Sequence, residues 1–328
     1  MVKVPDIYFL PEWGEYYETK EHQGKLEIFE VNHEFGHVFY QFIVRPIPID
    51  SGDKKYYDTI TPYGFSGPII TECEAGKKAE LAAVFNERFQ KYCEEQHIVT
   101  EYIRFNPWLE NFGDFKDYYS ARNQGNTLFI DLTVDDFYMD EFSPKARTQV
   151  RRAQKNGVEI ELDFNGSTAH EFHRLYEGMA QKHGFGDYYR FSEEFLKKSF
   201  ESLEGKQFFI NAKHEGKYIS SSFMLYHGDY LHYHLTANDP DFFHLAGNSL
   251  IVYEACRWGV ENGIKEVHLG GGSIEPIYQF KKRFTKTEPL ELLMGKKIRI
   301  QEAYDELVTL KTKDGGIENP DFFPLYRG

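Results

Sequence analysis

The segment HLGGGSIEPIYQFKKRF, residues 268–284, combines two features that suit an anionic ligand. Its three consecutive glycines leave backbone groups uncovered at the end of an apolar stretch. Lys281, Lys282 and Arg283 follow shortly afterwards. Backbone N–H groups and lysines stabilise oxyanions and bind phosphates. A loop that only joins a strand to a helix is the competing interpretation.

A second basic segment, residues 143–157, carries complete helix boundary signals. Ser143 suits the N-cap, Pro144 the first helical position, and Gly157 the position after the end. One basic stripe along this helix comprises Arg147, Arg151 and Lys155. Phosphate binding is one role for the stripe, and a favourable interaction with the helix dipole is the other.

A third segment, HLAGNSLIVYEACRWGVENG, places Gly247 and Asn248 at the start of an expected helix. Free N–H groups at a helix N-terminus hold anions, although many helices begin this way without binding anything. The strand IKEVHLGGG comes next. A strand, this loop, the helix and the second strand would form a wedge that admits a phosphate-bearing donor.

Two histidine patterns are weak metal candidates. HEFGH, residues 33–37, matches the HExxH pattern of zinc peptidases, but it falls in a turn between two expected strands. HYH puts His232 and His234 on one side of a strand, where we expect a ligand-facing or solvated surface. We predict no metal site.

Composition sets the broad class. With 328 residues, 41% of them hydrophobic and 27% charged, the chain has room for two globular domains. A net charge of -14 repels nucleic acid and anionic membranes as a whole, so local patches must hold any phosphate partner, and DNA is not expected. Three dispersed cysteines, no apolar run of roughly 18 residues and no signal-peptide layout predict a cytoplasmic protein without a transmembrane segment.

Hydrophobic periodicity gives the expected elements. Two strands joined by a turn are expected over 25–45, an ordered loop over 55–70, and helices over 77–96, 168–183, 192–203, 249–262 and 301–311. Further strands are IVTEYIRF, TLFIDLT, VEIELDF, three within 206–239, IKEVHLGGG and LELLMGKKIRI.

Each half contains strands, a Gly-containing loop, a long helix and another strand. This repeat predicts an α/β (α+β) protein with two similar domains, mixed sheets flanked by helices, at 1–145 and 146–328.

The order of SPKARTQVRRAQKNGVEIE, HLAGNSLIVYEACRWGVENG and VHLGGG followed by FKKRF resembles the FemABX-like family of peptidoglycan-bridge aminoacyltransferases. TPYGFSGPII resembles that family's N-terminal domain. The resemblance implies two tandem GNAT-type acyltransferase domains. It also implies a transferase that moves an amino acid from aminoacyl-tRNA onto an amine of a cell-wall precursor.

The resemblance also implies site residues. Phe280, Lys281 and Lys282 map to the segment that borders the acyl-donor channel. The residues that map to the helix near the phosphates of a nucleotide-linked or lipid-linked acceptor are Lys145, Arg147, Arg151 and Arg152. The chain lacks the long helical hairpin that some members use toward tRNA, so aminoacyl-tRNA and acyl-CoA both stay open as donor. We expect no bound cofactor.

We expect Lys281 or Lys282, with backbone N–H groups near the glycines, to stabilise the oxyanion or a donor phosphate. Glu275 is our preferred proton acceptor over Asp239 and Tyr278. The residues assigned to the donor are Gly247, Asn248, Gly271 and Phe280, and Tyr63 is assigned to the acceptor cleft. A CoA-dependent N-acyltransferase and a non-catalytic nucleotide-sugar binder are the alternatives.

Overall fold

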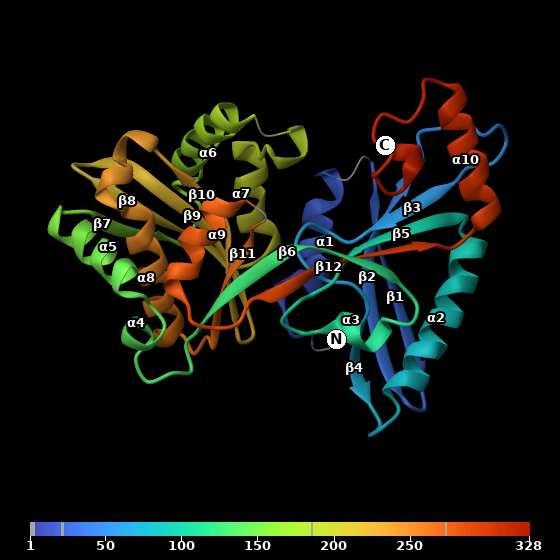
Figure 1. The fold of residues 1–328 in the computed structure, drawn as a ribbon, viewed down its shortest axis with the longest axis horizontal. Coiled ribbons are helices and arrows are strands. Elements are labelled where there is room, and N and C mark those ends of the chain that lie inside the picture. Colours follow the sequence, from blue (N-terminus) through green and yellow to red (C-terminus); the bar gives the residue numbers. More distant parts are fainter. Residues whose placement is uncertain (1–3, 21–22, 185, 273) are drawn as a thin grey trace. The chain divides into compact units, whose positions relative to one another are not determined.

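A computed structural model describes residues 4–20, 23–184, 186–272 and 274–328 (Figure 1). Contacts divide the chain into two compact units. The first holds Val4, Tyr8–Gln124 and Glu291–Gly328, and the second holds Pro5–Ile7 and Gly125–Leu290.

This division differs from the expected boundary between residues 145 and 146. Strand β6 (Ser120–Asp131) carries the chain into the second unit by pairing with β11 (Glu266–Gly272). Strand β12 (Leu290–Ile298) then pairs with β5 (Ile98–Arg104), which returns the last part of the chain to the first unit. Capping residues in the sequence indicate where a helix ends, but they do not indicate that the last part of the chain pairs with the first unit.

In the first unit the strands lie in the order β1-β2-β3-β5-β12, and β4 pairs with β2. The remaining bounds are β1 (Lys25–His33), β2 (Gly36–Pro46), β3 (Tyr57–Ile60) and β4 (Ile69–Cys73). Its main helices are α1 (Pro11–Tyr17), α2 (Lys78–Glu95), α3 (Asn111–Phe115) and α10 (Gln301–Lys313). Helix α2 buries Phe85 and Phe89 against Tyr40 and Phe42 of β2. Val99 belongs to a separate core with α10, because successive strand residues face opposite sides.

In the second unit the order is β6-β11-β10-β9-β8-β7. The remaining strands are β7 (Glu159–Asp163), β8 (Gln207–His214), β9 (Lys217–His227) and β10 (Tyr230–Asn238). The helices are α4 (Phe137–Asp140), α5 (Pro144–Lys155), α6 (Ala169–His183), α7 (Glu193–Ser202), α8 (Gly247–Glu261) and α9 (Glu275–Lys281). Phe208 packs in the core beneath α5 and α8, whereas its neighbour Phe209 contacts Phe172 of α6. Helices therefore cover both faces of this sheet (Figure 1).

The expected helices and most strands are confirmed, and the loop expected over 55–70 is wrong in part. Strands β3 and β4 occupy its two ends. β3 pairs with β2 on one side and β5 on the other, and these tertiary contacts override the Gly- and Pro-rich local sequence.

The architectural repeat is also confirmed. In the first unit β3 and β5 are parallel, and α2 lies between them in the chain. In the second unit β10 and β11 are parallel, and α8 lies between them. Each unit thus contains a parallel β-α-β crossover, the element that positions the candidate site.

Candidate functional site

The parallel strands β10 and β11 stay paired over only three residues of each. Tyr230–His232 pairs with Glu266–His268, and the ladder then stops. β10 has an irregularity between Tyr233 and Leu235, and β11 shifts register against β6 between His268 and Gly271. We call the ends of β10 and β11 beyond this short paired base the wedge. The backbone groups that leave the ladder there need other partners.

Gly270 makes this departure of β11 possible. Its φ of +71° lies in the left-handed region, which glycine adopts without strain. The GGG sequence therefore has a structural role at one glycine, and its neighbour Gly271 presents a carbonyl group to the site.

Lys281, the last residue of α9, binds the carbonyl groups released at the wedge. Its Nζ donates to the carbonyl oxygen of Gly271 at 2.8 Å and to that of Gly270 at 3.2 Å. The residue is only 9% exposed. Burial lowers the pKa of this lysine from 10.5 to about 8. The site therefore holds a cation that is protonated at neutral pH and lies against strand-end backbone.

The other residues expected on this segment point elsewhere. Lys282 Nζ donates to the Thr287 carbonyl at 3.2 Å. Glu275 is exposed in the first turn of α9, and its carboxylate accepts from Gln279 at 2.8 Å. The Phe280 ring packs 5.1 Å from Phe284. Of the expected catalytic residues, Lys281 is the one whose side chain contacts the glycine backbone of β11 in the described ranges.

The start of α8 is tied to the irregular part of β10. Asn248 Oδ1 accepts a hydrogen bond from the Tyr233 hydroxyl, and Thr236 Oγ1 lies 2.7 Å from the same phenol oxygen. Burial raises the pKa of Tyr233, so this phenol stays protonated. The Asn248 side chain thus joins the start of α8 to β10. The sequence analysis did not predict this interaction.

Gly247 lies in a tightly packed position. A Cβ atom there would lie 3.1 Å from Ser220 Oγ and 3.3 Å from Ala212 Cβ, so the helix start lies against β8 and β9. No side-chain hydrogen bond caps the N-terminus of α8 in the described structure. Its first N–H groups are therefore suited to a polar or anionic group.

The observed ends of helix α5 agree with the predicted ones. Its basic residues fall into two groups, one bonded to backbone carbonyl groups and one exposed. Ser143 Oγ accepts from the Ala146 N–H at 3.2 Å, and Gly157 has a φ of +70°. Arg147 donates to the carbonyl groups of Phe142 at 2.5 Å and Met139 at 3.3 Å, which gives it a structural role. The basic residues of α5 that are exposed on the surface are Lys145, Arg151, Arg152 and Lys155.

Tyr63 belongs to the first unit. Its ring stacks on Tyr17 at 5.4 Å, and its carbonyl accepts from the Trp13 indole at 2.7 Å. Asn111 steadies the following loop by donating to the carbonyl groups of Ser66 and Pro68.

The equivalent strands of the first unit form no wedge. β3 and β5 stay paired from Tyr57 with Ile98 to Ile60 with Tyr102, and a bridge between Ser66 and Phe105 extends the contact. Among the described elements, a parallel ladder that ends well before either of its strands does is therefore found in the second unit.

Among the described residues, no group of three or more His, Cys, Asp or Glu side chains is arranged to hold a metal ion. His33 and His37 lie on the two strands of the β1–β2 hairpin. The expectation of a ligand-facing or solvated HYH strand is wrong for His232. This residue is buried, and its Nε2 lies 2.8 Å from Asp6 Oδ2.

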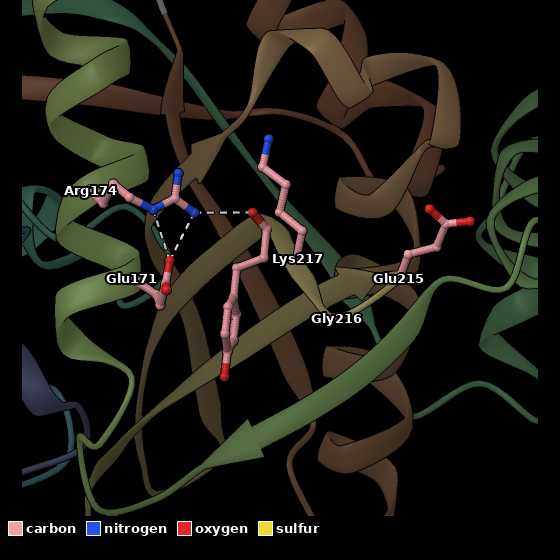
Figure 2. Close-up of a pocket in the computed structure, with 6 residues that line it drawn as sticks. Glu171, Arg174, Glu215, Gly216 and Lys217 are labelled. Atoms are coloured by element: carbon pink, nitrogen blue, oxygen red, sulfur yellow. Dashed lines mark hydrogen bonds and ion pairs between the residues drawn. The ribbon is translucent and has the colours of Figure 1, made fainter.

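An open pocket of about 460 Å³ lies on the second unit, and its lining includes none of the residues predicted for the site. It is lined by Glu171, Arg174, Glu215, Gly216, Lys217 and Tyr218. Figure 2 shows Arg174 directed toward Glu171, and the two side chains are 2.8 Å apart. Lys217 pairs with Asp239 at 3.0 Å, so both cations that line the pocket already have carboxylate partners.

Comparison with known proteins agrees with this geometry. Residues 144–282 match the family described as acetyltransferase (GNAT) domain. That match spans α5, the wedge and Lys281. The second unit therefore has the fold of GNAT-type acyltransferases.

The chain is also similar to the UDP-N-acetylmuramoylpentapeptide-lysine N(6)-alanyltransferase of Weissella viridescens. The two are 26% identical over 178 residues, 52% of this chain and 51% of that relative. The chain thus matches about half the length of this curated relative.

Solved structures extend the likeness over most of the chain. FemX superposes with a TM-score of 0.69 at 14% identity, covering 92% of this chain and 94% of FemX. A tandem GNAT protein from the clavulanic acid biosynthesis pathway superposes with a TM-score of 0.51 at 10% identity, covering 84% and 83%. These comparisons confirm the tandem GNAT fold and the resemblance to the FemABX-like family.

None of the described helices has the length and apolar character needed to span a bilayer.

Proposed function

We propose that this protein is an acyltransferase that moves an aminoacyl group from aminoacyl-tRNA onto an amine of a nucleotide- or lipid-linked peptidoglycan precursor. The contact between the buried Lys281 ammonium and the wedge backbone carries the proposal. The similarity to an alanyltransferase that acts on a UDP-linked muramoylpentapeptide supports this choice of substrates.

In the proposed reaction the amine nitrogen attacks the ester carbonyl of the donor. A carbon–nitrogen bond forms, the ester carbon–oxygen bond breaks, and the amine proton leaves while the ribose oxygen takes up a proton. The carbonyl oxygen carries negative charge in the transition state. A cation already fixed at that position stabilises this charge without having to reorganise.

Lys281 is suited to this role because an ammonium group has three N–H donors. Two of them bind the carbonyl groups of Gly270 and Gly271. The third is available to the donor carbonyl. Holding both substrates in line within the wedge supplies several kcal/mol more.

The same wedge supports acyl-CoA as the second candidate donor. The match to an acetyltransferase domain and the uncapped N-terminus of α8 favour it. We assign Gly247 and Asn248 to the donor side, and Phe280 to the donor channel. Glu275 as proton acceptor, and Lys145, Arg151, Arg152 and Tyr63 as acceptor contacts, remain predictions.

The deciding experiment incubates the purified chain with a lysine-containing UDP-linked muramoylpentapeptide and either alanyl-tRNA or acetyl-CoA. Mass spectrometry of the peptide identifies the product. We expect an alanyl adduct with alanyl-tRNA that is lost in Lys281→Met. An acetyl adduct would select the second donor. Acceptor binding without either adduct would contradict the enzyme assignment and favour the non-catalytic binder.

A further inference from the structure

The base of the wedge holds a buried cluster of ionisable side chains that the proposed chemistry does not use. Asp6, His232 and His268 are each at most 2% exposed. His232 and His268 form the last pair of the β10–β11 ladder. Their rings lie 5.4 Å apart at an angle of 26°. The cluster therefore marks the point where the two strands separate.

Asp6 reaches this point from the N-terminal segment. Its Oδ2 lies 2.8 Å from His232 Nε2, and because a carboxylate only accepts, the imidazole donates this hydrogen bond. Pro5–Ile7 packs with the second unit, although Tyr8 onward packs with the first. The Pro5 carbonyl also lies close to Gly228, in the turn between β9 and β10, where an added Cβ would lie 2.9 Å from it.

The β11 side of the cluster is fixed as well. Burial, followed by the charge of His232, holds the pKa of His268 well below its usual range, so its ring is neutral. Glu266 Oε2 lies 3.0 Å from His268 Nε2, and the Phe129 ring of β6 lies 5.7 Å from the His268 ring. Gly270, which turns β11 away from β10, comes two positions after His268.

We propose that Asp6 is a positioning residue that acts through His232 and fixes the end of the β10–β11 ladder, and hence the site where Lys281 contacts Gly270 and Gly271. A buried hydrogen bond to a carboxylate is costly to break, because the imidazole N–H loses a charged acceptor that water cannot replace there. Its loss loosens the His232–His268 pair first. The end of β11, whose Gly270 and Gly271 carbonyl groups accept from Lys281, is then no longer held in one position.

The expected effect of Asp6 on turnover rests on the proposed function. Its effect on the β10–β11 ladder is measured by hydrogen exchange, which does not require activity. Hydrogen exchange on the full-length chain compares wild type, Asp6→Ala and Asp6→Asn in segments 230–236 and 266–272. We expect Asp6→Ala to speed exchange there at least tenfold. Asp6→Asn keeps an acceptor oxygen for His232, and we expect near-wild-type exchange.

Asp163→Ala is the matched control, because Asp163 is a buried carboxylate of the same unit that accepts from Thr168 at 2.6 Å. We expect it to loosen the start of α6 and leave 266–272 protected. Unchanged exchange at 266–272 in folded Asp6→Ala would overturn the proposal. If Asp6→Ala does not fold, His232→Phe, which removes the same donor but keeps a ring, decides by the same criterion.

Kinetics supply the second readout. We expect Asp6→Ala to lower kcat roughly tenfold or more with the KM of the acceptor unchanged, since a small misplacement of the site affects the transition state more than acceptor binding. Recovery in Asp6→Asn supports positioning. A wild-type chain without transferase activity refutes the proposed function, while the exchange data still decide the role of Asp6.

Discussion

The Nζ atom of Lys281 lies 2.8 Å from the carbonyl oxygen of Gly271, which joins the end of helix α9 to the end of strand β11. This contact gives one residue two roles. It partners the backbone released by the wedge, and it places a positive charge where a donor carbonyl would enter. Structural and catalytic effects of its substitution must therefore be measured separately.

Replacing Lys281 with alanine should lower turnover by about 10²- to 10³-fold, the effect typical of removing one oxyanion donor. Lys282→Ala should have a much smaller effect, because Lys282 donates to Thr287 and not to the glycines. Steady-state acyl transfer measures the loss, and thermal unfolding shows whether the fold persists. Unchanged turnover in the Lys281→Ala/Lys282→Ala double variant would end the catalytic assignment.

The pH profile should reveal the charge state of Lys281. Burial lowers its pKa to about 8, so the ammonium form is present below that pH and is lost as pH rises through it. Catalysis by the cation predicts that kcat/KM falls above pH 8. Lys281→Arg keeps its charge to higher pH, so any activity it retains should not show that decline. A rate that rises through pH 8 would instead indicate that neutral Lys281 acts as a base.

The basic residues of α5 should fall into two classes. Arg151→Ala and Arg152→Ala should each raise the KM for a nucleotide-linked acceptor about tenfold, the effect of losing one charge-assisted hydrogen bond, with stability unchanged. Arg147→Ala should instead lower the unfolding free energy by about 1–3 kcal/mol, because it loses its bonds to the Phe142 and Met139 carbonyls.

Arg257→Ala serves as the control for these variants. Arg257 is an exposed arginine on α8, paired with Glu254 at 2.8 Å. A similar KM increase in this variant would mean that overall charge, and not α5, governs acceptor binding. Acceptor titrations at two salt concentrations separate these outcomes.

Helix α5 shows what the sequence alone predicts well. Its ends depend on local chemistry, a serine N-cap and a glycine with φ of +70°, and both signals lie within the segment itself. The tandem fold was also predictable, because each crossover repeats the same order of strand, helix and strand.

The wedge and its base depend on distant contacts. Asp6 and His232 are 226 positions apart, and no periodicity indicates that they meet. Likewise, the partners of Lys281 depend on the backbone conformation of Gly270 and on a register shift in β11. The sequence indicated where basic residues and glycines are concentrated, but it did not indicate which lysine contacts the glycines.

The C-terminal segment should stabilise the first unit through Asp58. This carboxylate is fully buried and pairs with Arg45 Nε at 2.9 Å on one oxygen and Arg327 Nε at 2.5 Å on the other. Asp58→Ala removes the buried carboxylate that Arg45 and Arg327 share and should lower the unfolding free energy by about 3–5 kcal/mol. Arg327→Ala leaves the Arg45 pair in place and should cost about 1–3 kcal/mol. Urea unfolding measures both, with the exposed pair variant Lys91→Ala as a near-neutral control. Equal, small losses in all three variants would show that the C-terminal segment does not stabilise the unit through Asp58.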